Sequence, residues 1–544
     1  MEASSSTPTA VEDPVTRPLH EYPDDTHKHA IIVGGGFAGL ACAKKLLSAS
    51  PKRNIKVTIL EASNDIGGRV KAHKSFLSQD QVLDLGAEFI HCQGHSLWDW
   101  VFEYFGGPEK NDDEDRQRFL GSQFESIFLL SHADGGPAAE PTKEGKYGMY
   151  YMDNDLVMYD DLRLNPLNEK LDATADHPPT NFGVQDSVAD ALGTKYSENT
   201  SPMSNSLWQL AVASFGNTAG CCDLSQLSIR QLSHFEHYWE EHEEEGDFRP
   251  PPTMGLYGVA KACSEQLKTL NKDSFELILN CEVQSIAQNI NETVVLQIAD
   301  GSVFRADAVV VTVPPPILPK IIKELPDFKV EALSKIGFER AVKVIVKLKE
   351  RLWPEKVQSI IAAGELIPEM WFRELQDTTS MDQPYYLATG FLVSSAADRF
   401  VALLNRKLEG IKTNGHEGDR NTLAGQMLME QLTKMLDSHL PSNETATQDL
   451  DSNILDAMIF DWKDDAPFAQ GGYMYPKVGI TPEHLEAMAA PHGRLFFAGE
   501  ATNTNACCTV QAAIETGERA ANQIVSFLGL GAPSTKQRGR IVGV

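Results

Sequence analysis

The glycine-rich segment at residues 34–39 constrains the fold of this chain more than any other feature. It reads Gly34-Gly35-Gly36-Phe37-Ala38-Gly39, a G-x-G-x-x-G pattern, and it directly follows the apolar run 30–33. An apolar run that ends in glycines is typical of a buried parallel strand entering a tight turn. The glycines permit the turn, let backbone amides approach a pyrophosphate and seat the following helix against the strand. The segment therefore predicts a dinucleotide-binding β-α-β unit.

A carboxylate at the end of the next apolar run supports this prediction. The run 57–60 ends at Glu61, which follows the last glycine of the pattern at the spacing typical of such units. A carboxylate there accepts hydrogen bonds from both hydroxyls of an unphosphorylated ribose and repels a phosphorylated one. The alternative is a helix N-terminus that binds no ligand. The combination of strand, glycines and acid favours the dinucleotide.

Length and composition narrow the class of protein. A chain of 544 residues is too long for one compact core, so two domains are expected. No apolar run approaches the ~20 residues of a membrane-spanning helix. The net charge of −28 disfavours nucleic acid and anionic membranes and favours cationic small molecules, with solubility as the alternative explanation. The eight cysteines include no C-x-x-C pair, so neither a metal site nor a disulfide framework is predicted.

The two ends of the chain carry no targeting pattern. Residues 1–28 are rich in Ser, Thr and Pro, contain several acids and lack an apolar core, which predicts a disordered tail and neither a signal peptide nor a transit peptide. The final Val542-Gly543-Val544 is not a peroxisomal signal. We therefore expect a cytoplasmic protein.

Two further motifs connect the chain with a known family. Gly67-Gly68-Arg69 follows Glu61 closely, and Phe497-Ala498-Gly499-Glu500 appears far later in the chain. With these motifs the sequence resembles the flavin-containing amine oxidases over about residues 29–105 and 250–528. Within that family it is most similar to the polyamine oxidases and to the catalytic domain of histone-lysine demethylases. The resemblance implies an FAD-dependent enzyme that oxidises a small-molecule amine with O2, giving an aldehyde, a shorter amine and hydrogen peroxide.

The predicted fold class is α/β plus α+β, with a two-part Rossmann-like FAD-binding domain and an interleaved substrate-binding domain. The FAD-binding domain is expected at 29–95, 251–320 and 466–530, and the substrate domain at 321–465 together with a mainly helical segment at 96–250. A loop-like tail follows at 531–544. Within 251–320, the runs 277–283 and 294–298 predict two strands, and Asp300-Gly301 predicts a hairpin turn.

The resemblance also implies which residues bind the cofactor. Arg69 is expected near the pyrophosphate, Val283 at the adenine through its backbone, and Glu500 at the ribityl and phosphate region. Thr509 and Val510 would begin the final helix beside the flavin ring, where the helix dipole favours negative charge. The full expected set is Gly34, Gly36, Phe37, Ala38, Gly39, Glu61, Ala62, Gly68, Arg69, Gly86, Ala87, Glu88, Val283, Gly499, Glu500, Thr509 and Val510.

Three residues are expected to act on the substrate side. Lys343 precedes Trp353-Pro354 at the spacing of the family lysine that holds a water at flavin N5. The alternatives are that Lys347 takes this role or that Lys343 is only an exposed lysine. His91 ends a Gly86-Ala87-Glu88-Phe89-Ile90-His91 segment that places it near the substrate channel; a histidine that only satisfies backbone groups is the alternative. Tyr473 would form one wall of the amine site, with Thr509 opposite.

Gly472 stands where monoamine oxidases carry the cysteine that bonds to FAD, so the resemblance implies non-covalent FAD. A histone-lysine demethylase-like protein is one alternative function. Another FAD oxidoreductase of the same fold, such as a desaturase or a protoporphyrinogen oxidase, is a second alternative, against which Lys343 and Tyr473 argue. The oligomeric state and the amine itself stay open.

Overall fold

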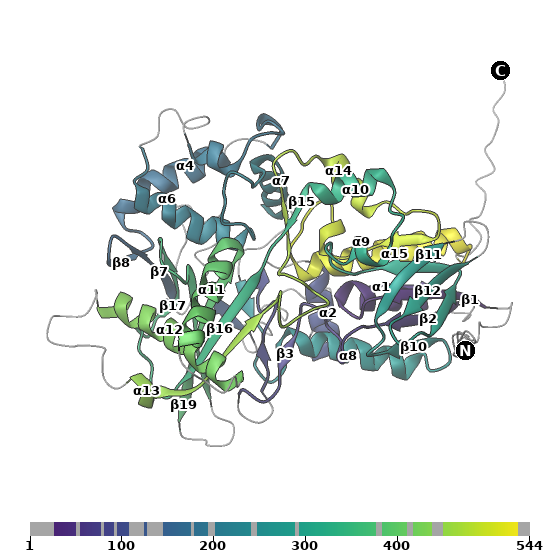
Figure 1. Ribbon diagram of the computed structural model, residues 1–544, viewed down its shortest axis with the longest axis horizontal. Helices are drawn as coiled ribbons and strands as arrows, with labels where there is room; N and C mark the ends of the chain where they lie inside the picture. Colours follow the sequence, from purple (N-terminus) through teal and green to yellow (C-terminus); the bar gives the residue numbers. More distant parts are fainter. Residues whose placement is uncertain are drawn as a thin grey trace, which may run out of the picture.

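The computed structural model describes residues 27–49, 55–77, 81–91, 95–107, 124–127, 145–175, 179–193, 202–240, 247–288, 293–376, 383–410, 417–437 and 450–530. These residues form two halves that lie side by side, one around a five-stranded sheet and the other around a seven-stranded sheet (Figure 1). The tails predicted at 1–28 and 531–544 lie outside the described residues, except for residues 27 and 28.

A parallel sheet organises the first half. In space its strands run β10 (Phe275–Ile278), β2 (Ile55–Leu60), β1 (Lys28–Val33), β14 (Ala308–Val311) and β22 (Leu495–Phe497). All neighbouring pairs are parallel. Numbered by their place in the chain, these strands have the order 3-2-1-4-5 of a dinucleotide-binding sheet. The Rossmann-like prediction is therefore confirmed, and residues from three distant parts of the chain build one sheet.

Both faces of this sheet are covered, which explains its continuous apolar strands. Ala30 and Ile32 face one layer, and Ile31 and Val33 face the other. The helical layer holds α1 (Phe37–Ala49), α2 (Ser96–Phe105), α8 (Gly255–Leu270) and α15 (Val510–Leu528). The other layer is a three-stranded antiparallel sheet with a short helix, comprising β11 (Val283–Gln288), β12 (Val294–Ile298), β13 (Val303–Ala306) and α9 (Leu318–Ile321).

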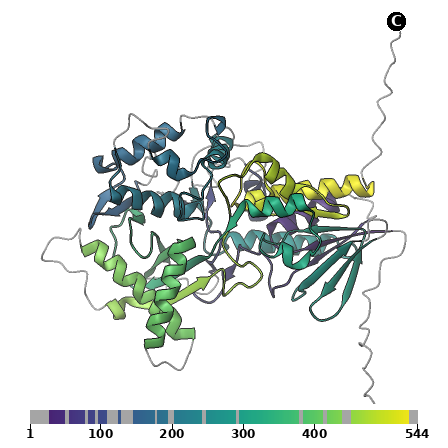
Figure 2. The ribbon, with the colours of Figure 1, turned by 45° about the horizontal axis from the view of Figure 1, so that its top comes forward.

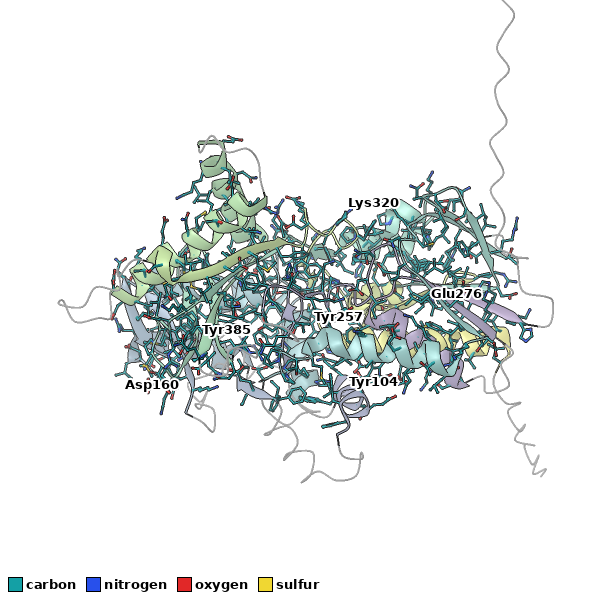
Figure 3. The ribbon with its side chains drawn as sticks, turned by 90° about the horizontal axis from the view of Figure 1, so that it is seen from below. Tyr104, Asp160, Tyr257, Glu276, Lys320 and Tyr385 are labelled. Carbon is teal, nitrogen blue, oxygen red and sulfur yellow. The ribbon has the colours of Figure 1, made fainter. Side chains whose placement is uncertain are left out.

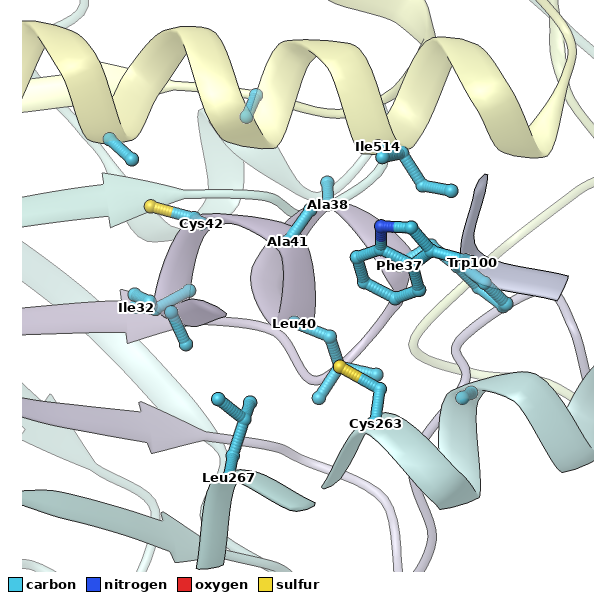
Figure 4. Close-up of a cluster of buried hydrophobic side chains, with 14 of the residues drawn as sticks. Ile32, Phe37, Ala38, Leu40, Ala41, Cys42, Trp100, Cys263, Leu267 and Ile514 are labelled. Carbon is cyan, nitrogen blue, oxygen red and sulfur yellow. The ribbon is translucent and has the colours of Figure 1, made fainter. Parts of the chain in front are cut away.

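Helix α1 lies between α15 and α8, with small side chains toward α15 and Leu40 toward α8 (Figure 4). A Cβ atom on Gly517 of α15 would lie 2.2 Å from the carbonyl oxygen of Ala38. The two helices therefore approach closely because glycine stands at this contact.

The second half is built on a mixed sheet of seven strands. Their order is β20 (Ile454–Asp461), β16 (Ala341–Leu348), β19 (Pro384–Val393), β18 (Glu369–Gln376), β17 (Val357–Ala362), β7 (Tyr147–Met152) and β8 (Asp155–Met158). Val342, Val344 and Val346 pack with α11 (Ser394–Gly410) and α12 (Glu417–Asp437) on one face. On the other face, Ile361 packs with Leu207 of α6 (Asn205–Ala211).

Helices and short turns of residues 162–240 cover the part of this face formed by β17, β7 and β8, on the side of the sheet opposite to α11 and α12 (Figure 2). These elements are η1 (Leu162–Leu164), α4 (Asn165–Ala175), η2 (Pro179–Asn181), α5 (Val188–Leu192), α6 (Asn205–Ala211), η3 (Val212–Gly216) and α7 (Ile229–Glu240). Short elements complete the two halves, namely β3 (Ala72–His73), β4 (Leu83–Asp84), β5 (Ile90–His91), β6 (Glu125–Ile127), β9 (Asp247–Arg249), α10 (Asp327–Ser334), β15 (Ile336–Phe338), α13 (Leu450–Asn453), β21 (Met474–Pro476), α14 (Pro482–Ala489) and η4 (Glu500–Thr502). Figure 3 shows Asp160 and Tyr385 in the half with the seven-stranded sheet and Glu276 and Lys320 in the other half.

Two local expectations differ from the structure. The run 277–283, predicted as one strand, is split into β10 and β11 because Asn280 takes a left-handed φ of 54° that interrupts an extended strand. The segment 96–250, predicted as mainly helical, also contains β7 and β8, which turn at Asp153-Asn154 with positive φ at both residues. Asp and Asn tolerate this conformation better than other side chains, so this pair is a hairpin signal.

None of the helices among the described residues combines the length and the apolar character that crossing a membrane requires.

Candidate active site

A single cavity of about 1390 Å³ runs from the carboxyl ends of the parallel strands to the face of the seven-stranded sheet. Small-molecule pockets usually measure about 300–1,000 Å³, so this one has room for more than a single small ligand. Every residue predicted to bind the cofactor or act on the substrate lines it, except Gly39. The predicted residues thus meet in one place, although they lie between residues 34 and 510 of the chain.

The glycine turn has the geometry that its sequence requires. Gly34 has a left-handed φ of 114°, and a Cβ atom on Gly39 would lie 2.0 Å from the carbonyl oxygen of Gly34. Gly39 therefore does not face the cavity; it allows α1 to begin directly against the turn. No side chain of these glycines covers the backbone amides at the N-terminus of α1, so a pyrophosphate can approach them.

Glu61 lies at the end of β2, buried beside this turn. Its Oε2 atom accepts a hydrogen bond from the Gly35 amide at 2.5 Å, and its Oε1 atom accepts from the Ser63 amide at 2.8 Å and the Ser63 hydroxyl at 2.7 Å. These donors hold the carboxylate at the cavity wall. A buried carboxylate at the tip of the second strand fits the ribose end of a dinucleotide.

Arg69 and Glu500 form the middle of the cavity wall. Nη1 of Arg69 donates to Oε1 of Glu500 at 2.7 Å and to the carbonyl oxygen of Gly472 at 2.9 Å. Oε2 of Glu500 accepts from the Cys508 amide at 3.1 Å. The pair ties the turn after β2 to the segments that precede β21 and α15, so three distant parts of the predicted cofactor site are fixed to one another.

Helix α15 points its N-terminus at the cavity. Thr509 is its N-cap, and the Thr509 hydroxyl oxygen accepts from the Ala512 amide at 3.2 Å. Thr509 and Val510 both line the cavity, so the positive end of the helix dipole faces whatever is bound there.

Lys343 lies on the cavity face of β16 and is buried. Its Nζ donates to Oε2 of Glu88 at 2.9 Å, to the carbonyl oxygen of Gly86 at 2.9 Å and to that of Asp84 at 3.3 Å. The sequence raised Lys347 as an alternative. Lys347 instead places its Nζ 4.2 Å from the ring centroid of Tyr385 and is not among the described residues that line the cavity.

Glu88 connects Lys343 with a second buried cation. Its Oε1 atom pairs with Nε of Arg249 at 2.8 Å, and Arg249 is 2% exposed. Burial alone would raise the pKa of Glu88, but the charges of Lys343 and Arg249 lower it to about 2. Glu88 is therefore ionised at neutral pH, and it holds Lys343 beside the cavity.

Asp84 lies next to this group. Burial and the neighbouring Glu88 charge raise the pKa of Asp84 to about 7, against the opposing effect of Lys343. Its Oδ1 atom is buried and accepts no hydrogen bond from the described residues.

His91 and Tyr473 border the substrate end of the cavity. Nδ1 of His91 lies 2.7 Å from Oδ1 of Asp247, across the pairing of β5 with β9. The hydroxyl of Tyr473 donates to the carbonyl oxygen of Thr218 at 2.8 Å. Burial raises the pKa of the Tyr473 hydroxyl well above its ordinary value, with Cys508 and Glu369 adding to the effect, so the ring is a neutral wall.

The structure adds residues that the sequence did not reveal. Lys343 on β16 is directly opposite Phe391 on β19, which is directly opposite Glu369 on β18. Strands are about 4.8 Å apart, so the Cα atoms of Lys343 and Glu369 are roughly 10 Å apart on one face. All three residues line the cavity.

Glu369 is 2% exposed, and both of its oxygen atoms accept hydrogen bonds. Oε1 accepts from the Trp371 indole at 2.7 Å, and Oε2 accepts from the Asn217 amide at 3.0 Å. The Trp371 ring stacks on Phe391 at 5.1 Å between centroids. A carboxylate is thus held in an aromatic wall. No sequence pattern pointed to Glu369; only the register between β18 and β19 places it in line with Lys343.

The fold and this cavity define a two-domain, dinucleotide-dependent oxidoreductase whose substrate end is aromatic. The family model for flavin containing amine oxidoreductase matches residues 37–525, and the chain belongs to that family. The flavin cofactor, the fold class and the likeness to polyamine oxidases and demethylases predicted from the sequence are therefore confirmed.

Individual relatives are distant. The chain is 26% identical to polyamine oxidase 5 of Oryza sativa subsp. japonica over 94% of this chain and 91% of the relative. It is 25% identical to lysine-specific histone demethylase 1 homolog 3 of Arabidopsis thaliana over 93% of this chain but only 30% of the relative. The solved structure of cyclohexylamine oxidase from Brevibacterium oxydans IH-35A has the same fold, with a TM-score of 0.63 and 17% identity over 92% of this chain and 100% of that one.

Proposed function

We propose that this protein is an FAD-dependent oxidase of di- or polyamines that holds FAD without a covalent bond. It would convert the amine, O2 and water to an aldehyde, a shorter amine and hydrogen peroxide. The observation that carries the substrate class is the row Lys343, Phe391, Glu369 across the cavity wall. A substrate that spans this row meets a carboxylate at one end.

Glu369 is suited to hold a second positive charge of the substrate. Two of its donors, the Trp371 indole and the Asn217 amide, are neutral groups, and a carboxylate oxygen can accept more than one hydrogen bond. In this buried place an ammonium group would gain a charge-assisted hydrogen bond. A monoamine has no charge to offer there, so the carboxylate favours substrates with two or more amines.

The wall beside Lys343, where we propose that the amine reacts, is aromatic. Phe89, Trp371 and Phe391 form a continuous aromatic surface, with centroid distances of 4.8 Å and 5.1 Å. An apolar surface disfavours the protonated form of an amine, and the neutral form is the one that can be oxidised. When bound, FAD accepts a hydride equivalent from the carbon next to that amine and delivers the electrons to O2. The side chains orient the C–H bond and exclude water.

Production of hydrogen peroxide with spermine, N-acetylspermine, a monoamine or a methylated histone peptide tests the reaction. Peroxide from spermine or N-acetylspermine supports the proposal, and turnover of the monoamine alone contradicts it. Glu369→Gln should raise KM for the polyamine about 10–100-fold, because a hydrogen bond to a charged group contributes about 1.5–3 kcal/mol. The matched control is Glu374→Gln on the same strand, whose side chain is 45% exposed and pairs with Arg351.

The mode of FAD binding has its own test. Gly472 lines the cavity and offers its carbonyl oxygen to Arg69, but it carries no thiol that could bond to the flavin. Acid or heat denaturation should therefore release all yellow colour into the supernatant after the protein is precipitated. Flavin absorbance that stays with the precipitated chain would contradict non-covalent binding.

Demethylation of a lysine side chain is the second candidate, and the 25% identity to a histone demethylase homologue favours it. Formaldehyde release from the methylated peptide, with no peroxide from spermine, would replace the polyamine proposal by this one.

A further inference from the structure

Two neighbouring cysteines lie in the cavity wall just before α15. The Sγ atoms of Cys507 and Cys508 are 2.9 Å apart, and both residues line the cavity. Cys507 is buried and Cys508 is partly exposed. Neither thiol takes part in the function proposed above.

The backbone brings these two thiols together. Successive side chains normally point to opposite sides of an extended chain. Cys508 has a left-handed φ of 67°, which is uncommon for any residue other than glycine, Asn or Asp. The Cys508 amide is held by Glu500 at 3.1 Å, and its thiol donates to the carbonyl oxygen of Met474 at 2.8 Å. These two bonds hold Cys508 in the conformation that brings its thiol to that of Cys507.

We propose that Cys507 and Cys508 form a dithiol site that a hydroperoxide oxidises reversibly to a disulfide. One thiolate attacks the peroxide oxygen, giving a sulfenic acid and water; the second thiol then attacks that sulfur, forming the S–S bond and releasing a second water. Two thiols lose two hydrogen atoms, and the peroxide is reduced to two waters. The oxidant is hydrogen peroxide, a small molecule that the cavity admits.

The disulfide would change the wall of the active site. Cys508 would lose the hydrogen from its thiol, and with it the bond to the carbonyl of Met474, the residue after Tyr473. Adjacent Cα atoms are about 3.8 Å apart, closer than in most disulfides, so such a bond is strained and easily reduced. We therefore expect amine oxidation to fall when the bond forms and to return when it is reduced.

A second vicinal pair in the chain offers a matched control. Cys221 and Cys222 are also adjacent, but their thiols point to different carbonyl oxygens, those of Asp223 and Val393. Neither belongs to the described cavity lining. This pair has the same spacing in sequence without the contact between sulfur atoms.

The test is peptide mass spectrometry of the purified holoenzyme after treatment with hydrogen peroxide and alkylation. Trypsin yields residues 495–519 with one pair and 196–230 with the other. The first peptide should become two hydrogen atoms lighter and escape alkylation until dithiothreitol is added, while the second stays alkylated. If both thiols of the first peptide remain alkylated, or carry only sulfinic or sulfonic acid, the proposal is wrong.

Phenylarsine oxide, which bridges two close thiols, provides a measurement that needs no peroxide. One molecule should bind per wild-type chain and per Cys221→Ser/Cys222→Ser chain, and none to Cys507→Ser. Absence of binding to the wild-type protein would overturn the proposal even if the Cys507 variant failed to fold. Added peroxide and arsenical act on the thiols directly, so neither result depends on which amine the enzyme oxidises.

Discussion

At the scale of single residues, the ion pair between Lys343 and Glu88 should contribute both to the stability of the fold and to the rate of the reaction, and the two contributions can be measured separately. Lys343→Met leaves Glu88 buried with Arg249 as its remaining partner. We expect a loss of about 1–3 kcal/mol in the free energy of unfolding, because a buried charge loses one of two partners. Flavin reduction by amine or reoxidation by O2 should slow ~10²-fold, the usual effect of removing a preorganised polar group. Urea unfolding and stopped-flow absorbance measure the two effects.

The double variant Lys343→Met/Glu88→Gln distinguishes the two roles. It also takes away the carboxylate that pairs with Nε of the buried Arg249, so it should be less stable than Lys343→Met while its rate stays as low as in that variant. Lys347→Met is the control on the same strand, since that side chain lies over Tyr385. Equal rates in wild type and Lys343→Met would make Lys343 a structural residue only.

Sequence patterns predicted the site residues that belong to short motifs. They missed site residues that come together only through the pairing of strands distant in the sequence. Gly34, Glu61 and Arg69 stand in or next to local glycine signals, and the structure brings them to one cavity. Glu369 has no such motif; its place opposite Phe391 depends on the register between β18 and β19. Register follows from the packing of whole strands, which a single sequence does not specify at that distance.

At the scale of elements, a buried lysine supports the end of α14. Nζ of Lys329 on α10 donates to the carbonyl oxygens of Ala487 and Met488 at 2.8 Å and 3.0 Å, in the last turn of α14. It also lies 3.7 Å from the ring centroid of Phe497 on β22. One side chain thus joins a helix, its neighbour and an edge strand of the parallel sheet.

This lysine predicts how stability depends on pH. Burial, with a smaller effect of Arg519, lowers the pKa of Lys329 to about 7, against 10.5 as its ordinary value. Between these values the unfolded chain binds more protons than the folded one, so stability should rise with pH through this window and lie lowest below pH 7. Urea unfolding at pH 7 and pH 10 should show the wild type gaining stability relative to Lys329→Met. A difference that does not change with pH, or that falls, would contradict the lowered pKa.

The elements themselves were predictable where their patterns are strong. The apolar strands around residues 30–33 and 308–311 and the final helix have clear patterns, and α15 begins at Val510 with Thr509 as its N-cap, close to the expected start. The break at Asn280 and the hairpin at Asp153-Asn154 were missed, since each depends on a left-handed residue within an otherwise extended run. Asn and Asp permit that conformation but do not require it.

At the scale of the whole molecule, three distant parts of the chain build one half, and the cavity opens toward the sheet of the other. The glycine turn and Glu61 occupy the first half, while Lys343 and Glu369 stand on the second. The relative position of the two halves therefore sets the distance between a bound cofactor and the carboxylate that we propose for the substrate.

The net charge of −28, from 48 basic and 76 acidic residues, predicts how the enzyme responds to salt. Long-range attraction of a polycation raises its rate of capture, and it weakens as the Debye length falls from ~30 Å at 0.01 M salt to ~10 Å at 0.1 M. We expect kcat/KM for spermine to fall roughly tenfold over this range while kcat stays constant. A monoamine should show a smaller decrease, because it carries one charge.

Glu369 is buried and less screened, so Glu369→Gln should raise KM by a similar factor at every salt concentration. A kcat/KM for spermine that is independent of salt would show that net charge serves solubility alone.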